Sequence, residues 1–173
     1  VQIMYTDRDT KGIKPDHGVT LTSCLMNPKS KGDIKIQSSN PLDLPLVNPN
    51  FLSHQDDINI FLDSLKLARK VIETQPLNNI IKEEILPGRD INTDEDLIKY
   101  AKKMIKTNWH PVGTCKMGKD NDEMAVLNSK LEVKGITNLR VFDVSMMPTI
   151  VGANTNAPAM AIADKATDLL LQS

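Results

Sequence analysis

Two loop segments, far apart in the sequence, carry the side chains best suited to chemistry. Residues 108–115 (Asn-Trp-His-Pro-Val-Gly-Thr-Cys) place His110 in a loop punctuated by proline and glycine, and residues 148–156 place Asn154 in a glycine-containing turn before the last helix. A histidine exchanges a proton near neutral pH, and an amide N–H donates to an oxygen on which negative charge develops. We therefore predict that His110 and Asn154 meet in space and form half of an active site, with His110 as the base.

The composition of the chain excludes several classes of function. Its 173 residues suit about one domain, and 21 basic side chains balance 22 acidic ones, so nothing predicts binding to nucleic acid. No run approaches the roughly 18 apolar residues of a membrane helix. Two cysteines, Cys24 and Cys115, offer no metal-binding spacing, and we expect two buried thiols rather than a disulfide.

The start of the sequence gives no information about targeting. The chain begins with valine and lacks the layout of a signal peptide. We expect the given sequence to begin in the middle of a domain. Residues 1–17, which are polar, should form a surface loop between strands.

Glycine-rich nucleotide-binding motifs are absent from this sequence because its eight glycines are widely dispersed.

Two alternating segments and one short apolar run predict three strands. Residues 18–26 should form an inner strand and residues 33–37 its antiparallel neighbour, with Ile34 and Ile36 pointing inward. Three prolines make residues 40–50 an extended connector rather than a strand of the ladder. Residues 139–143 (Leu-Arg-Val-Phe-Asp) predict a short apolar strand that ends in an acid.

Capping signals predict the helices. Ser53 and Thr93 each begin a capping box followed by an amphipathic stripe, and the first of these helices should end by Pro76. The second helix leads into the loop of residues 108–115 that contains His110. Residues 154–158 begin the last helix, where Pro158 is tolerated because its missing N–H is not needed in a first turn.

Several segments of this chain resemble the C-terminal part of the glucose–methanol–choline (GMC) family of FAD-dependent oxidoreductases. Residues 110–118 (His-Pro-Val-Gly-Thr-Cys-Lys-Met-Gly) resemble the family's motif around its active-site histidine. Residues 135–149 resemble its late strand and turn, and residues 152–166 its closing turn and helix. Residues 27–32 are similar to a segment of its substrate domain. Asparagine rather than histidine at position 154 resembles the insect glucose-dehydrogenase branch.

The resemblance implies an α+β fold and a division of the chain. Residues 1–107 would belong to a substrate domain built on an antiparallel sheet with helices. Residues 108–173 would be the C-terminal part of an FAD-binding α/β domain that carries His110 and Asn154. The family's nucleotide-binding motif lies near its N-terminus, so an N-terminal FAD-binding segment or chain would be a partner. The resemblance also suggests secretion.

The same resemblance implies roles for further residues. Oxidation of an alcohol or a sugar needs proton transfer to a base and hydride transfer to FAD, so the protein positions and polarises the substrate. The flavin would be contacted by Asp143 and Val144, and by Thr155 and Asn156 at a helix N-terminus whose partial positive charge favours a reduced, anionic flavin. Trp109 would border the substrate cavity.

Plainer interpretations stay open for the same residues. Asn154 could simply cap the last helix, Asp143 could bind local backbone N–H groups, and Trp109 could belong to the core. Two other functions also remain open: a lyase in which His110 moves a proton while the flavin is structural, and a detached module with a binding role.

Overall fold

The computed structural model describes the backbone of Gln2–Ile3 and all of residues 18–171, and it divides into two compact units. One unit comprises Val1–Gly32 and Pro49–Lys106, and the other comprises Asp33–Asn48 and Thr107–Ser173. The predicted surface loop over residues 1–17 lies outside the described residues, apart from Gln2–Ile3. Each unit is described by itself below.

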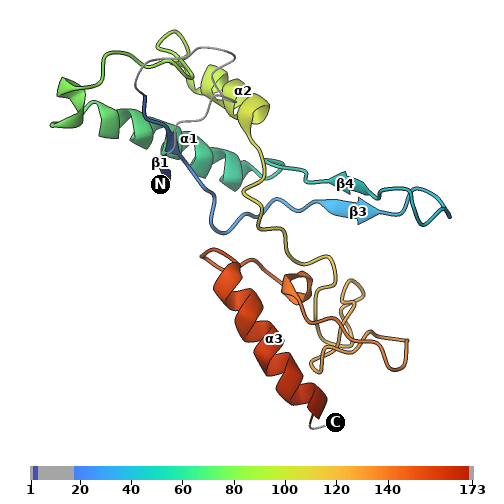
Figure 1. Cartoon of the computed structure of the whole chain (residues 1–173). Coiled ribbons are helices and arrows are strands. Elements are labelled where there is room, and N and C mark those ends of the chain that lie inside the picture. The colour runs from blue at the N-terminus through green and yellow to red at the C-terminus, as the bar shows by residue number, and fades with distance from the viewer. Residues whose placement is uncertain (1, 4–17, 172–173) are drawn as a thin grey trace. The chain divides into compact units, whose positions relative to one another are not determined.

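Two helices that contact each other are the main regular elements of the first unit (Figure 1). Helix α1 spans Gln55–Ile72 and helix α2 spans Asp94–Met104, with a short 3₁₀ helix, η1 (Leu77–Asn79), between them. The apolar stripes predicted from the sequence are the half-buried and buried faces of both helices, as amphipathic packing requires.

The predicted cap of α2 is confirmed, whereas that of α1 is displaced by one residue. The Thr93 hydroxyl accepts from the Asp96 N–H at 3.1 Å. In α1 the N-cap is His54 rather than Ser53, because the His54 Nδ1 accepts from the Asp56 N–H at 3.2 Å. An imidazole nitrogen can therefore serve the function usually given to a hydroxyl at this position.

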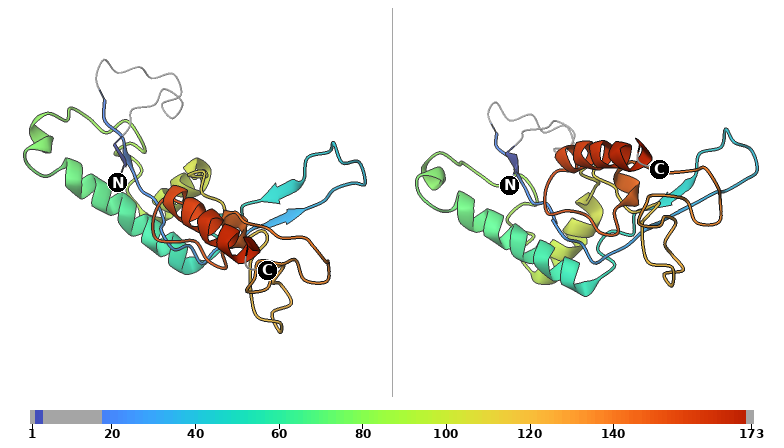
Figure 2. Two further views of the ribbon diagram at one scale, coloured as in Figure 1. Left: turned by 60° about the horizontal axis from the view of Figure 1, so that its bottom comes forward. Right: turned by 90° about the horizontal axis from the view of Figure 1, so that it is seen from below.

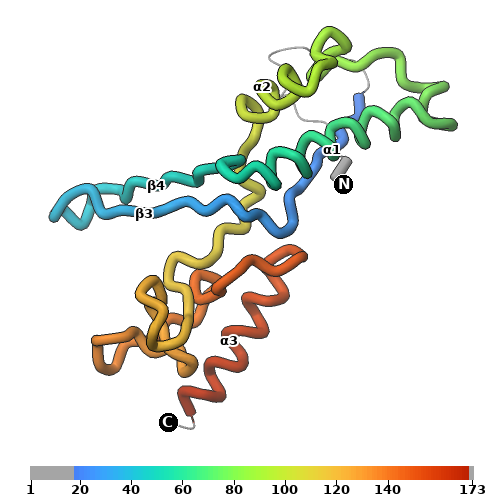
Figure 3. Tube along the Cα trace, turned by 180° about the vertical axis from the view of Figure 1, so that it is seen from behind, coloured from blue at the N-terminus to red at the C-terminus, as the bar shows by residue number. Residues whose placement is uncertain are grey.

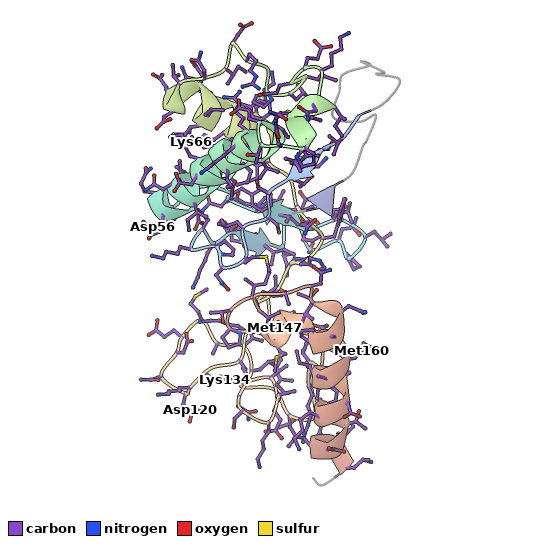
Figure 4. The ribbon with its side chains drawn as sticks, turned by 90° about the vertical axis from the view of Figure 1, so that its left-hand side faces the viewer. Asp56, Lys66, Asp120, Lys134, Met147 and Met160 are labelled. Atoms are coloured by element: carbon purple, nitrogen blue, oxygen red, sulfur yellow. The ribbon has the colours of Figure 1, made fainter. Side chains whose placement is uncertain are left out.

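Buried charges fasten the loops of the first unit to α1. The Asp57 carboxylate accepts from the Lys29 and Ser30 N–H groups, at 2.9 and 2.7 Å. Arg69 holds Glu84 with both Nε and Nη2, and its Nη2 also donates to the Gly88 and Ile91 carbonyls. At the surface, Lys66 of α1 pairs with Asp94 of α2 at 2.7 Å, and Figure 4 shows Lys66 on α1.

The predicted pairing between residues 18–26 and 33–37 is wrong. Within residues 18–26, only Leu21–Thr22 form a strand, β2. This strand pairs antiparallel with β1 (Gln2–Ile3). Strand β3 (Asp33–Lys35) pairs instead with β4 (Leu46–Asn48), so that Asp33 faces Asn48 and Ile34 faces Val47.

Strand β4 forms within the predicted connector because its flanking prolines leave its own amides free. Pro45 and Pro49 stand immediately outside the three-residue strand, so Leu46, Val47 and Asn48 all keep an N–H for pairing. The hairpin is a long two-stranded arm in Figure 2. Ile34 and Ile36 are 47% and 89% exposed, so the prediction that they point inward is also wrong.

The remainder of the second unit consists of irregular turns around one helix (Figure 3). Helix α3 spans Asn156–Leu171, and a 3₁₀ helix, η2, spans Val144–Met146. The core of this unit contains Leu127, Leu131, Met146, Met147 and Ala166. Figure 4 shows Met147 beside α3, whereas Met160 on the helix is 61% exposed.

The predicted strand over residues 139–143 is wrong. The structure contains only an isolated bridge between Glu132 and Arg140 at this place, supported by hydrogen bonds from the Val133 N–H to the Leu139 carbonyl and from the Val141 N–H to the Leu131 carbonyl. Leu131 has φ of +61°, which turns the partner segment away before a regular ladder can extend.

Both cysteines lie in the described part of the chain, and neither forms a disulfide. Cys24 is exposed, so the prediction of two buried thiols is wrong for Cys24, and Cys115 is only half-buried where it packs against the core of the second unit. Among the described residues, no helix is long and apolar enough to cross a membrane, and no cluster of His, Cys, Asp and Glu side chains is suited to a metal ion.

Candidate active site

The two segments predicted to carry the chemistry meet in the second unit through His110 and Thr155. The His110 Nδ1 lies 2.8 Å from the Thr155 Oγ1, although the residues are 45 positions apart. Thr155 is buried, with 8% of its surface exposed, whereas His110 is half-buried. The imidazole is therefore anchored on its Nδ1 side and retains contact with solvent.

Backbone hydrogen bonds bring these segments together. After the histidine loop, the Cys115 N–H donates to the Ser145 carbonyl at 3.0 Å, and the Met117 N–H donates to the Met146 carbonyl at 2.8 Å. Gly113 has φ of +87°, and a Cβ there would lie 3.3 Å from the Met147 carbonyl oxygen, so this turn needs glycine. The loop is thus laid along the 3₁₀ helix η2 that leads to α3.

Asn154 lies next to this contact but does not cap the helix. The Thr155 carbonyl accepts from the Ala159 N–H at 2.9 Å, which places Thr155 at the N-cap of α3. The Asn154 side chain is exposed and makes no hydrogen bond within the described part of the chain. Its amide is therefore available to a group that this chain does not supply.

Asp143 and Val144 are largely occupied by local structure. One oxygen of the Asp143 carboxylate accepts from the Ser145 N–H at 2.7 Å and so caps η2, which is the plainer of the two interpretations of this residue. Val144 packs against the core. A contact with a flavin would use the exposed side of Asp143 and the backbone of Val144, and that role stays a prediction.

Trp109 has an unusual backbone conformation immediately before the histidine. Its φ is +60°, which is strained for a bulky residue, and its side chain is 72% exposed. The Trp109 N–H donates to the Thr107 hydroxyl at 3.0 Å, which supports this turn. The alternative that Trp109 belongs to the core is wrong.

The start of α3 offers donors that fit the electron-rich end of a flavin. Asn156 and Ala157 occupy the first two helical positions, whose N–H groups have no acceptor within the helix. The exposed amides of Asn154 and Asn156 add side-chain donors. This set suits a group that gains negative charge.

Sequence reasoning assigned Thr155 to the cofactor and missed its contact with the histidine. One signal pointed to it: Pro158, three residues later, has no N–H to occupy the hydroxyl of an N-cap threonine. The Thr155 side chain is thereby left for another partner.

Comparisons with known proteins identify relatives over most of the chain. Residues 28–163 match the family model described as GMC oxidoreductase, for the C-terminal domain. An alcohol dehydrogenase [acceptor] from Pseudomonas putida is 38% identical over 97% of this chain and 30% of its own length. An oxygen-dependent choline dehydrogenase from Vibrio vulnificus is 39% identical over 90% of this chain and 28% of its own length.

Solved structures agree with this relationship. The crystal structure of pyridoxine 4-oxidase from Mesorbium loti is similar with a TM-score of 0.78 and 28% identity, over 86% of this chain and 28% of that one. A fungal aryl-alcohol oxidase has a TM-score of 0.74 and 29% identity, over 86% of this chain and 24% of its own. The chain thus spans about 30% of the length of the curated relatives it matches. Because the family model covers residues 28–163, the chain belongs to the GMC oxidoreductase family, whose members depend on FAD, and corresponds to the C-terminal domain of that family.

Proposed function

We propose that the protein containing this chain is an FAD-dependent oxidoreductase that oxidises an alcohol, with His110 as its base and Asn154 as a donor to the substrate oxygen. The observation that carries the proposal is the hydrogen bond between His110 and Thr155, because it joins the two segments that resemble the family's active-site motifs. The related alcohol and choline dehydrogenases favour a CH–OH substrate.

Each residue has a distinct task in this reaction. The His110 Nε2 takes the hydroxyl proton of the substrate, while Nδ1 stays bound to Thr155. The Asn154 amide donates to the substrate oxygen as negative charge develops there, and an amide does so without competing as a base. When bound, FAD supplies the acceptor for the hydride that leaves the carbinol carbon.

The residues that would hold FAD come from the same loop cluster. Asn156 and the backbone of Thr155 present donors at the start of α3, and Asp143 and Val144 line the preceding turn. Trp109, which is exposed beside His110, would border the substrate. The nucleotide-binding motif would come from an N-terminal segment or chain.

Replacement of the base tests the proposal. In the full-length protein, His110→Ala should slow anaerobic reduction of the flavin by choline or benzyl alcohol about 10²- to 10⁴-fold, the usual contribution of a general base. Asn154→Ala should slow it about a hundred- to a thousandfold. His54→Asn is the matched control, since it removes an exposed histidine but keeps a good N-cap. Undiminished reduction in His110→Ala would contradict the role of His110 as base.

The same stopped-flow experiment separates the alternatives. A lyase would form product without bleaching the flavin absorbance, and a binding module would show no turnover. A choline-like alcohol is the first substrate to test, because choline dehydrogenases are among the relatives. Oxidation of a sugar by a secreted, glucose-dehydrogenase-like enzyme is the alternative that the resemblance at position 154 suggests.

A further inference from the structure

We propose that Thr155 is a positioning residue for His110: its hydroxyl accepts the Nδ1 proton of the imidazole and leaves the Nε2 lone pair facing the substrate. The proposal rests on the proposed function, because it assigns Nε2 as the basic atom. It starts from the 2.8 Å separation of Nδ1 and Oγ1, the one hydrogen bond of the His110 ring within the described residues.

The hydroxyl is held firmly enough to act as an anchor. Thr155 is 8% exposed and stands at the N-cap of α3, a helix of 16 residues. Ala166 of the same helix is fully buried in the core of this unit, so the helix cannot shift without disturbing that core. Threonine is also stiff at χ1, which keeps Oγ1 in one place.

Competition for the hydroxyl is reduced by the sequence of the first turn. The side chain of an N-cap residue usually accepts from the N–H two or three positions later. Three positions after Thr155 stands Pro158, which has no N–H. A lone pair of the Thr155 oxygen is therefore available for the histidine.

The direction of the hydrogen bond follows from the proton that His110 has to accept. A neutral imidazole has one N–H and one lone pair, and an imidazolium has two N–H groups. Proton uptake at Nε2 requires the lone pair there, so Nδ1 must carry the hydrogen and donate it to Oγ1. The same bond persists in the imidazolium, where its donor is charged and the bond is stronger. The ring therefore needs no rearrangement when it takes the proton.

Three variants of the full-length, flavin-loaded protein test this assignment. Thr155→Val removes the hydroxyl but keeps the branched shape, Thr155→Ser keeps the hydroxyl, and Thr149→Val removes an exposed threonine of the preceding loop as the matched control. The first measurement is ¹⁵N NMR of protein labelled in histidine, with the His110 signals assigned by their loss in His110→Ala. We expect the proton on Nδ1 in the wild type, Thr155→Ser and Thr149→Val, and a mixture or the opposite tautomer in Thr155→Val.

The second measurement is the anaerobic reduction of flavin by choline, or by benzyl alcohol where choline is not oxidised. Thr155→Val should lower the limiting reduction rate constant about 10- to 100-fold, by analogy with the outer hydrogen-bond partners of metal-binding histidines. The substrate dissociation constant should change less than twofold, and Thr155→Ser should restore most of the rate. If the role of Thr155 were purely structural, Thr155→Ser would lose about as much rate as Thr155→Val. The substrate dissociation constant would then rise together with the loss of rate.

The outcomes separate this inference from the proposed function. An unchanged tautomer and rate in Thr155→Val, together with a large loss in His110→Ala, would overturn the role of Thr155 and leave His110 as the base. An undiminished rate in His110→Ala would overturn the proposed function itself. A wild-type His110 with its proton on Nε2 would also refute the assignment.

Discussion

Replacement of Asp57 by asparagine provides the sharpest test of how the first unit is held together. The Asp57 side chain is fully buried in the first turn of α1. One of its oxygens accepts from the Lys29 N–H at 2.9 Å and the other from the Ser30 N–H at 2.7 Å. The Ser30 hydroxyl in turn accepts from the His54 N–H at 3.1 Å. This clamp connects a loop to a helix that begins more than twenty residues later.

The expected loss can be worked out from these contacts. An asparagine has one acceptor oxygen, so one of the two N–H groups would face its NH₂ group and lose its partner. A buried donor without an acceptor costs about 1–3 kcal/mol, and the remaining bond would no longer be charge-assisted. We expect Asp57→Asn to weaken the docking of residues 27–32 by about 2–4 kcal/mol in total.

Hydrogen–deuterium exchange of the full-length protein measures this loss directly. A weakening of about 2 kcal/mol should speed exchange of the peptide covering residues 27–32 about 30-fold, since 1.4 kcal/mol corresponds to a factor of ten. Asp63→Asn, an exposed position on the same helix, should change it little. If the exchange rate of this peptide in Asp57→Asn stayed within about threefold of the wild-type rate, Asp57 would not be what docks residues 27–32 on α1.

The pH dependence gives a second check with a definite sign. Burial raises the pKa of Asp57, but hydrogen bonds from the Lys29 backbone and from Ser30 lower it by more, so the pKa lies below its ordinary value of 3.8. A depressed pKa means that the carboxylate stabilises the folded state above pH 3.8, and that this contribution is lost as the pH falls below it. The difference in thermal stability between wild type and Asp57→Asn should therefore narrow from pH 5 to pH 3.

Two further substitutions test packing and buried charge. Gly118→Ala should destabilise the second unit by about 1–3 kcal/mol, because the added Cβ would lie 2.7 Å from the Cβ of Ala125. Thermal unfolding measures this loss. The control is Gly152→Ala, where an added Cβ would meet nothing within 4 Å. Glu84→Gln should cost about 3 kcal/mol in urea unfolding, because it leaves the guanidinium of Arg69, 17% exposed, without its charged partner. A change in unfolding free energy below about 0.5 kcal/mol would contradict the packing argument for Gly118→Ala or the buried-charge argument for Glu84→Gln.

Local signals in the sequence predicted the helices well because a helix is built from neighbouring residues. The stripe of α1 and the cap at Thr93 could be identified without any knowledge of the remainder of the chain. Strands were predicted poorly because alternation does not specify a partner. Residues 33–37 alternate equally well beside residues 18–26 or 46–48, and only tertiary structure selects β4.

The residue that contacts His110 is Thr155 rather than the predicted Asn154, and the difference has a physical cause. Residues 154–156 read Asn-Thr-Asn, and all three are good N-cap residues, so residue type alone cannot choose the cap. The structure selects Thr155, since its carbonyl receives the first helical hydrogen bond. That choice turns the threonine toward His110 and leaves Asn154 exposed.

Burial then separates the residues of this motif by their task. A group that must bind a substrate or cofactor cannot have its hydrogen bonds satisfied by its own loop, because it would have to break them to act. A group that holds another side chain in place must be satisfied and enclosed. Asn154 meets the first requirement and Thr155 the second. In the proposed mechanism, the neighbouring pair thus divides into a side chain offered to the reaction and one that orients the histidine. Exchanging the two, as Thr-Asn at 154–155, should then abolish both proposed roles while conserving composition.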